Sequence, residues 1–332
     1  MLRNIIRNRL PSTPQKRLPG FGSRWRKRAL ILAGVVVAFF ILGHLGVRFV
    51  LWPQIEKSKP TLERLMSARL GAKVSMDDVQ VSWTGIRPSF EVKGLRFNDP
   101  ESSQIPPPLL IENIQGELSW LSFYHLAPYF HEITFDNVQL SVQRDTKGEI
   151  TVAGIPIHGK PNDFSAENWL LSQNEIQINN ATIFWQDQKG RKLKTAIDVQ
   201  RFRLSNGIRQ HQSALVATTP WSSNPINIEA SFTHQLAGQV GDWRDWAGSF
   251  TWNIDELNLS QLTQDIALPL QDLAGTLNTK GSLKLDAGRI DKSELYLAAD
   301  QLKVQLNKDE DALTFGRLET NLIQENLSLI HI

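Results

Sequence analysis

Apolar and polar residues alternate in a repeated pattern along most of this chain. Within residues 176–183 the apolar side chains stand two, then three, then two positions apart. Each half alternates like a β-strand with one buried face, and an extra residue joins the halves. That residue would turn the second half over unless a bulge absorbs it. The spacing therefore predicts bulged strands whose apolar side chains lie on one face.

The same spacing recurs in four other segments. The positions that share it are Phe90, Val92, Leu95, Phe97, Ile133, Phe135, Val138, Leu140, Ile176, Ile178, Ala181, Ile183, Ile197, Val199, Phe202, Leu204, Trp252, Ile254, Leu257 and Leu259. A weaker copy, residues 109–116, ends in Gly116. Two interpretations fit this pattern. Either the strands form the core of an ordinary all-β domain, or a long sheet uses its apolar face as a binding site.

The first 50 residues have a different composition. Residues 1–28 contain nine Lys and Arg together with Pro and Gly, which predicts a flexible basic tail. Residues 29–50 include 19 residues without a formal charge, enough to cross a hydrocarbon core of about 30 Å as a membrane anchor. The preceding basic residues place the N-terminus in the cytoplasm. A cleaved signal peptide is the competing interpretation, but small residues of a cleavage site do not follow.

A short amphipathic helix is predicted within residues 51–73. Its signature is Pro60 near the start, an apolar face of Leu62, Leu65, Met66 and Leu70, and Gly71 just past the end. We expect this helix to cover the open edge of a sheet and block pairing with other chains. Strand patterns dominate residues 74–326, with helical interruptions around residues 120–130 and 166–172.

Charge and cysteine content exclude several classes of protein. The net charge is +2, yet all basic residues of the tail precede the first acidic residue, Glu56, so the remainder is acidic on balance. A nucleic-acid-binding body would carry a basic face instead. The chain has no Cys, which excludes disulfides, thiolate metal sites and Cys nucleophiles.

The sequence also lacks the residue patterns that catalysis needs. It contains no His-Glu-x-x-His, Gly-x-Ser-x-Gly, P-loop or dinucleotide-binding motif. His125 and His131 with Glu132 have no spacing typical of a metal site, and we expect surface histidines there. The ten Trp residues suit either sugar stacking or the packing of a broad sheet. We therefore expect no enzyme activity, cofactor or bound metal.

The order of these features resembles the AsmA-like envelope proteins, and several segments are similar to their YhdP branch. These segments are residues 138–145 with Gly148, 154–157, 168–173, 176–187, and 202–207 with His211. The resemblance covers residues 29–300, with its most specific part at residues 169–187. The basic tail lies outside the shared pattern.

The resemblance implies a mainly β fold: one N-terminal transmembrane helix, a short capping helix, then a long, mostly antiparallel, curled sheet that forms a groove. It implies a single-pass inner-membrane protein of a Gram-negative bacterium, with its bulk in the periplasm, that moves phospholipid towards the outer membrane. The 20 positions given above would then line the groove and contact glycerophospholipid acyl chains. About 15 to 18 strands spaced about 4.8 Å apart would make it near 80 Å long.

Two other functions stay open at this point. TamB-like relatives suggest a scaffold for outer-membrane protein assembly, in which a sheet edge would accept a strand. A polysaccharide enzyme would need a carboxylate pair that the sequence does not provide. Family members are longer than this chain, and residues 327–332 can be encoded by a transposase end sequence used in preparing sequencing libraries. We therefore expect an N-terminal fragment whose last six residues are artificial.

Overall fold

The computed structural model describes residues 23–51, 54, 58–98, 107–125, 127–156, 164–188, 193–235, 238–265, 272–307, 309 and 311–325. The chain divides into two units, Met1–Pro53 and Gln54–Ile332. The first contains α1 (Ser23–Gly46) and a π-helical turn (Val47–Leu51). Within the described residues no helix has both the length and the hydropathy needed to cross a membrane. The anchor at residues 29–50 thus stays a prediction, and residues 1–22 and 326–332 lie outside the described part.

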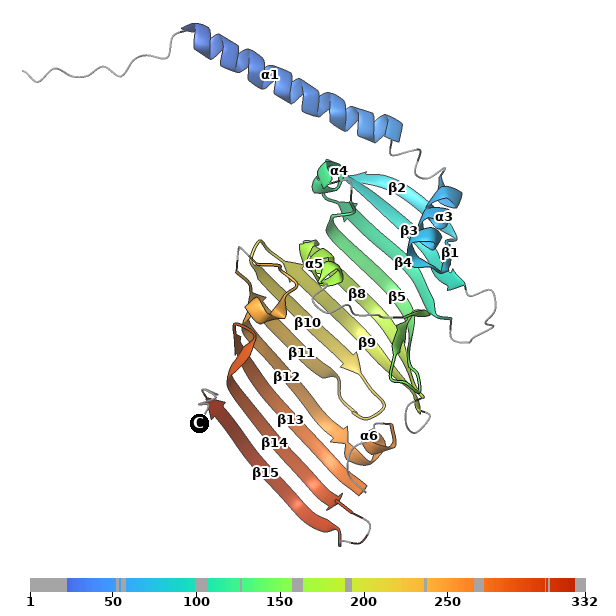
Figure 1. Cartoon of the computed structure of the whole chain (residues 1–332), viewed down its shortest axis with the longest axis vertical. Helices are drawn as coiled ribbons and strands as arrows, with labels where there is room; N and C mark the ends of the chain where they lie inside the picture. The colour runs from blue at the N-terminus through green and yellow to red at the C-terminus, as the bar shows by residue number, and fades with distance from the viewer. Residues whose placement is uncertain are drawn as a thin grey trace, which may run out of the picture. The chain divides into compact units, whose positions relative to one another are not determined.

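The second unit is built on one sheet that is open at both edges (Figure 1). Its strands are β1 (Lys73–Ser75), β2 (Asp78–Thr84), β3 (Arg87–Asn98), β4 (Leu109–Leu118), β5 (Phe130–Arg144), β6 (Ile150–Val152), β7 (Ile155–Pro156), β8 (Glu175–Asp187), β9 (Leu193–Asn206), β10 (Gln210–Thr218), β11 (Ile226–Thr233), β12 (Ala247–Asn258), β13 (Asp272–Asp286), β14 (Arg289–Gln305) and β15 (Leu313–Glu325). The predicted mainly β fold is confirmed.

Nearly every strand pairs with its neighbour in the sequence, and the pairing is antiparallel. Two pairs are exceptions. Strand β1 pairs antiparallel with β3, and β5 runs parallel to β8, with Ile133 opposite Ile176. A parallel pair needs a long crossover, and the 30 residues between β5 and β8 supply it. The main path has twelve strands, because β1 and β2 share one side of β3, and β6 and β7 form a side ribbon on β5. Twelve strands span about 53 Å, less than the expected length.

An extra residue with a left-handed backbone is present within five strands. Four of them, β3, β5, β8 and β12, are strands where the spacing predicts it; the fifth is β14, which was not predicted, and the predicted strand β9 has no residue of this conformation. The positions are Gly94, Asn137, Asn180, Glu256 and Gln301, with φ of 61°, 54°, 56°, 56° and 52°. Asn and Gly tolerate this left-handed conformation better than other residues. In β5 and β8 the extra residues lie at the same level, between the pairs Asp136–Asn179 and Val138–Ala181. The bend therefore lets both halves of each strand keep their apolar side chains on one face.

Helix α3 (Lys59–Leu70) contacts the edge strand β1. The Glu63 carboxylate accepts the Met76 N–H at 2.9 Å, and the Ser67 hydroxyl accepts the Val74 N–H at 2.8 Å. Two backbone donors at this edge are thereby already satisfied. Such satisfaction removes part of the template that an edge strand offers to another chain.

The apolar face of α3 is narrower than the sequence predicts. Leu62 and Met66 pack against the hydrophobic core, as expected. Leu65 and Leu70 do not, being 62% and 39% exposed. The edge of a sheet presents less surface than its face, so one pair of side chains four residues apart is enough to cover it.

Within the described residues, three further α-helices lie between strands, α4 (Leu121–His125), α5 (Ser165–Ser172) and α6 (Leu259–Asp265), together with a short 3-10 helix, Trp243–Asp245. The first two are the predicted interruptions. The third overturns the expected position of Leu259, which begins α6 instead of ending β12. Its side chain is 4% exposed, so Leu259 is buried as expected, but as a helix residue.

Candidate functional site: the apolar face of the sheet

The strand register aligns apolar residues into rows that cross the sheet. One row takes a single residue from each strand from β3 to β15 along the main path. It consists of Val92, Ile114, Phe135, Ile178, Phe202, Leu215, Ile228, Trp252, Gly281, Leu295 and Leu322. Neighbouring members are one strand spacing apart, about 4.8 Å. We call these eleven residues the apolar row.

Glycines do not interrupt the apolar face, because neighbouring aromatic rings fill their places. A Cβ atom on Gly281 would come within 2.1 Å of the Trp252 ring. A Cβ on Gly116, the last position of the weaker copy, would come within 2.4 Å of the Phe90 ring. Each large ring therefore covers the adjacent strand, and the surface stays apolar across both positions.

Burial of the apolar row decreases along the sheet. Val92 and Ile114 are buried, at 9% and 7% exposure. The members from Phe135 to Leu295 other than Gly281 are half-buried, and Leu322 is 54% exposed. In a closed two-layer core these central positions would be fully buried. The burial pattern fits a face that is partly covered and partly accessible.

Sixteen of the 20 expected lining residues belong to one hydrophobic cluster, made by β3, β5, β8 and β9 with their neighbours. The other four, Trp252, Ile254, Leu257 and Leu259, lie outside that cluster. Leu257 is buried at 9%, and Trp252 is in the apolar row. The structure thus brings the first sixteen together and places Trp252 further along the same face.

Leu215, Ile228, Leu295 and Leu322 were missed by the sequence interpretation. They lie on β10, β11, β14 and β15. The two-three-two spacing does occur on β14, at Leu297, Ala299, Leu302 and Val304, but the sequence interpretation did not include it. On the other three strands the available sequence signal was a simple alternation of apolar and polar residues, as in residues 226–230. Only the register shows that these residues extend the same row.

The opposite face is polar and joined by hydrogen bonds between strands. Gln177 donates to Glu132 at 3.2 Å, and Thr182 donates to Asp198 at 2.7 Å. Arg203 forms an ion pair with Glu175 at 2.9 Å. These side chains alternate with the apolar ones, so the sheet is amphipathic along its length.

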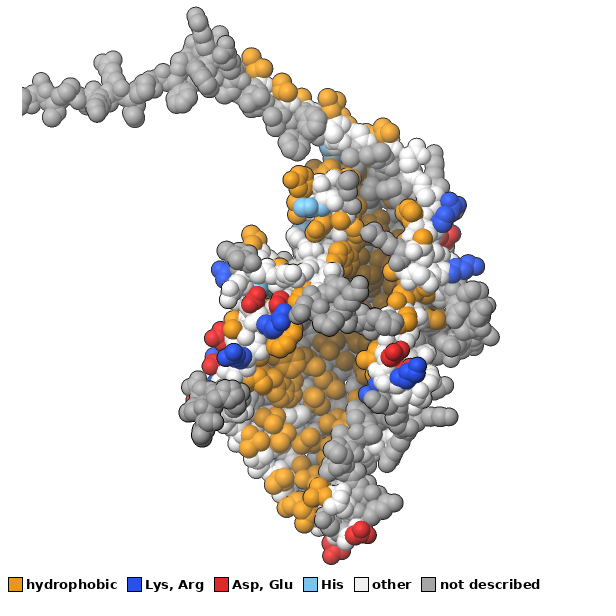
Figure 2. All heavy atoms as spheres, in the orientation of Figure 1, with side chains coloured by type: hydrophobic (Ala, Val, Ile, Leu, Met, Phe, Trp, Pro, Cys, Tyr) orange, Lys and Arg blue, Asp and Glu red, His pale blue; other side chains and the backbone are white. Residues whose placement is uncertain are grey.

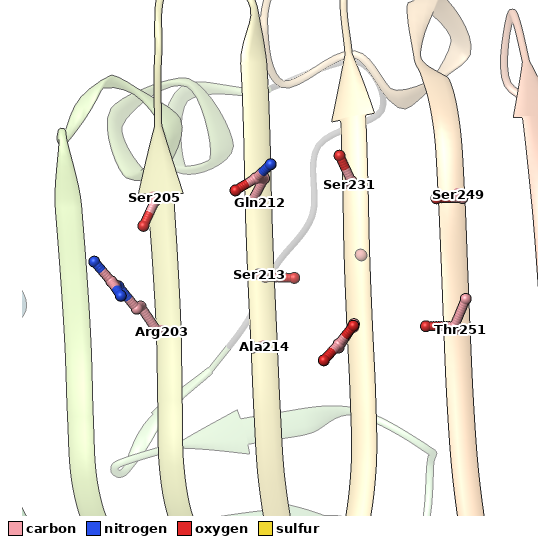
Figure 3. Close-up of a pocket in the computed structure, with 10 residues that line it drawn as sticks. Arg203, Ser205, Gln212, Ser213, Ala214, Ser231, Ser249 and Thr251 are labelled. Atoms are coloured by element: carbon pink, nitrogen blue, oxygen red, sulfur yellow. The ribbon is translucent and has the colours of Figure 1, made fainter.

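A shallow concavity of about 510 Å³ lies on the polar side, over β9 to β12 (Figure 3). Ser205, Gln212, Ser231, Ser249 and Thr251 line it, together with charged groups. Its hydroxyl and amide groups suit water better than hydrocarbon. We therefore place a site for an apolar ligand on the other face.

Figure 2 shows apolar side chains gathered over the apolar face, from the first strands to the last. Helix α6 contacts β12, β13 and β9, so it lies across part of this face. Leu171 of α5 is buried in the hydrophobic cluster. Between these covers, half-buried members of the apolar row remain partly accessible.

An aromatic stack ends the apolar face near α5. His211 stacks on Phe232 with ring centroids 4.9 Å apart, and Phe232 stacks on Trp246 at 3.8 Å. His211 is 1% exposed, and its Nδ1 lies 2.8 Å from Asn206 Oδ1. Burial, with a smaller effect of nearby His234, lowers the pKa of His211 to about 4. At neutral pH this histidine is therefore an uncharged part of the stack.

The described residues include no group of three or more His, Asp or Glu arranged to hold a metal ion. His125 packs against Tyr124 and Tyr129, with ring centroids 4.9 and 5.2 Å away. The Asn174 amide lies 3.4 Å from His131 Nδ1. The two histidines thus have different neighbours.

Comparison with known families decides the identity of this fold. A family model described as YhdP protein matches residues 16–326. The chain belongs to the YhdP family. A search of curated proteins gives no match. In this YhdP-family chain the matched range includes every strand from β1 to β15, so the apolar row lies wholly within the family region. The expected membership of the YhdP branch is confirmed.

Proposed function

We propose that this chain carries glycerophospholipid acyl chains along the apolar face of its sheet. In this proposal it is anchored in the inner membrane of a Gram-negative bacterium, and its sheet lies in the periplasm. There it moves phospholipid between the inner and outer membranes and so maintains the permeability barrier of the outer membrane. Membership of the YhdP family supports a bridge-like lipid transport protein. No catalytic residue, cofactor or nucleic-acid partner is part of the proposal.

The apolar row is the observation that supports this function most directly. An acyl chain of about 16 carbons costs roughly 13 kcal/mol when it crosses water unshielded, at about 0.8 kcal/mol per CH₂. A few polar strands in the path would restore much of that barrier. The apolar row has a non-polar residue or a ring-covered glycine on every strand from β3 to β15 along the main path. An acyl chain could therefore pass from strand to strand without leaving an apolar surface.

The polar face suits the same proposal. A lipid carrier in the periplasm must itself stay soluble while it exposes part of an apolar surface. Hydrogen bonds such as Asn179 to Asp136, at 2.9 Å, hold polar side chains on the outer side of the sheet. The sheet can thus present water-compatible groups on one face and hydrocarbon on the other.

The scaffold alternative depends on a free sheet edge. At the β1 edge, the side chains of Glu63 and Ser67 already accept the N–H groups of Met76 and Val74. Strand addition there would have to displace α3. This observation favours use of the face over use of that edge.

A block in the apolar row tests the proposed transport. Leu322→Asp places a carboxylate on the row at an exposed position, where it does little harm to folding. The matched control is Asn321→Asp, on the opposite face of the same strand. We expect pulse-labelled phospholipid to reach the outer membrane more slowly in cells with Leu322→Asp only. Equal transport by both variants, with equal protein levels, would count against the proposal.

A further inference from the structure

An exposed aromatic surface lies at one end of the first strands. Ile86 in the β2–β3 turn is 69% exposed, and Trp120, Leu121 and Tyr124 around α4 are 37%, 53% and 82% exposed. The rings of Trp83 and Trp120 lie 6.4 Å apart, which joins the two segments. We call Ile86, Trp120, Leu121 and Tyr124 the rim patch. Neighbouring exposed apolar side chains of this kind mark interaction surfaces more often than isolated ones do.

The rim patch is held in a defined shape. The Ser122 hydroxyl donates to the Tyr129 carbonyl at 2.7 Å and accepts the Tyr129 N–H at 2.9 Å. The Ser119 N–H donates to the same carbonyl at 2.8 Å. The Phe123 ring packs against Trp120 with centroids 5.3 Å apart. Residues 119–129 are therefore already ordered before binding, so their exposed side chains lose little conformational freedom when a partner binds.

The chemistry of the rim patch fits the surface of a bilayer. Trp and Tyr concentrate at membrane interfaces because an apolar ring and a polar tip suit the headgroup boundary. Residues 83–88 and 119–131 contain no Asp or Glu, and the Arg87 guanidinium lies 3.9 Å from the carboxylate of Glu117 next to them. Such segments do not repel the anionic headgroups of a phospholipid surface.

The length of chain before the sheet points to the same partner. If residues 29–50 cross the bilayer, as the sequence predicts, their uncharged run ends at Val47 and α3 begins at Lys59. The 11 residues between them reach about 40 Å at full extension. On that prediction, the connection sets an upper limit on the distance between the bilayer and the start of α3.

We infer that the rim patch docks on the phospholipid bilayer, with Ile86, Leu121 and Tyr124 inserted at the headgroup boundary. This inference goes beyond the proposed function and does not depend on what fills the apolar face. A protein that carried another apolar ligand would still dock through the same residues.

The absence of Cys makes the test direct, because one introduced Cys is the only labelling site. The full chain is reconstituted in vesicles of phosphatidylethanolamine and phosphatidylglycerol, with bimane at Tyr124→Cys or Leu121→Cys. Ile208→Cys is the matched control, because Ile208 is 89% exposed in the β9–β10 turn and outside the rim patch. Thr146→Cys gives a second control in the β5–β6 turn.

Quenching by lipids that carry a nitroxide on the acyl chain is then measured for each site. We expect severalfold stronger quenching at positions 121 and 124 than at 146 and 208. Equal quenching at all four sites would overturn the inference. A difference in quenching between the sites that appears only at a high protein-to-lipid ratio would also overturn it, because it would indicate contact between copies of the chain. Photo-crosslinking of phospholipid to the apolar row can still succeed in either case. Failure of docking is therefore separable from failure of transport.

Discussion

The indole ring of Trp252 occupies the space that a side chain at position 281 would need. A Cβ on Gly281 would approach its Cζ2 atom to 2.1 Å, and the ring is also held by a 3.3 Å hydrogen bond from Nε1 to Thr279. One large residue on β12 thus requires the smallest residue at the facing position of β13. This pairing keeps the apolar row continuous where a strand has no side chain.

Gly281→Ala is therefore expected to destabilise the fold by about 1 to 3 kcal/mol, the usual cost of overpacking. Urea unfolding followed by far-UV circular dichroism measures the change. The matched control is Gly316→Ala on β15, where a Cβ would meet nothing within 4 Å. Equal stability losses in the two variants would contradict the packing assigned to Trp252.

The bulge residue Asn180 provides a second prediction. Its φ of 56° is unfavourable for a β-branched side chain and easy for glycine. We expect Asn180→Val to cost about 1 to 3 kcal/mol of unfolding free energy and Asn180→Gly to be close to neutral. If Val were tolerated as well as Gly, the bend would not depend on the left-handed conformation.

The cap on the first edge is testable by hydrogen exchange. Glu63→Ala and Ser67→Ala each leave a backbone N–H of the β1 edge without its acceptor, at a cost of about 1 to 3 kcal/mol. The amides of Met76 and Val74 should then exchange faster. Leu65→Ala is the control, because Leu65 is 62% exposed and does not pack on the core. Unchanged exchange in Glu63→Ala would show that α3 does not protect this edge.

His211 predicts how stability depends on pH. Its folded-state pKa is about 4, below the ordinary 6.5, because burial disfavours the charged ring. Between pH 6.5 and 4 the unfolded chain binds a proton that the folded chain does not, so stability falls as pH falls. The loss amounts to about 3 kcal/mol at most. His211→Gln should flatten this part of the stability curve relative to the native chain, and an unchanged slope would assign it to other groups.

Much of the fold was predictable because its signals are local. The two-three-two spacing predicted the bulges at Asn137 and Asn180, since one extra residue between alternating halves allows few arrangements. The mainly β class and the helices at residues 121–125 and 165–172 were also predictable from local sequence patterns.

The predictions that failed concern features that depend on contacts between distant segments. Leu259 continues the apolar spacing of β12 whether it ends a strand or begins a helix, so spacing alone could not place it in α6. Leu65 is apolar and on the expected helix period, but only the width of the sheet edge decides that it stays exposed. The row from Leu215 to Leu295 needs the register of five strands, which no single segment encodes.

Photo-crosslinking in cells shows directly whether phospholipid contacts the apolar row. A crosslinking amino acid replaces Ile178 or Phe202 in the apolar row, and Gln177 or Thr182 on the polar face of β8. We expect phospholipid adducts at Ile178 and Phe202 and few at Gln177 and Thr182. Equal lipid yield from the two faces, or adducts with protein alone at Ile178 and Phe202, would contradict the proposed function.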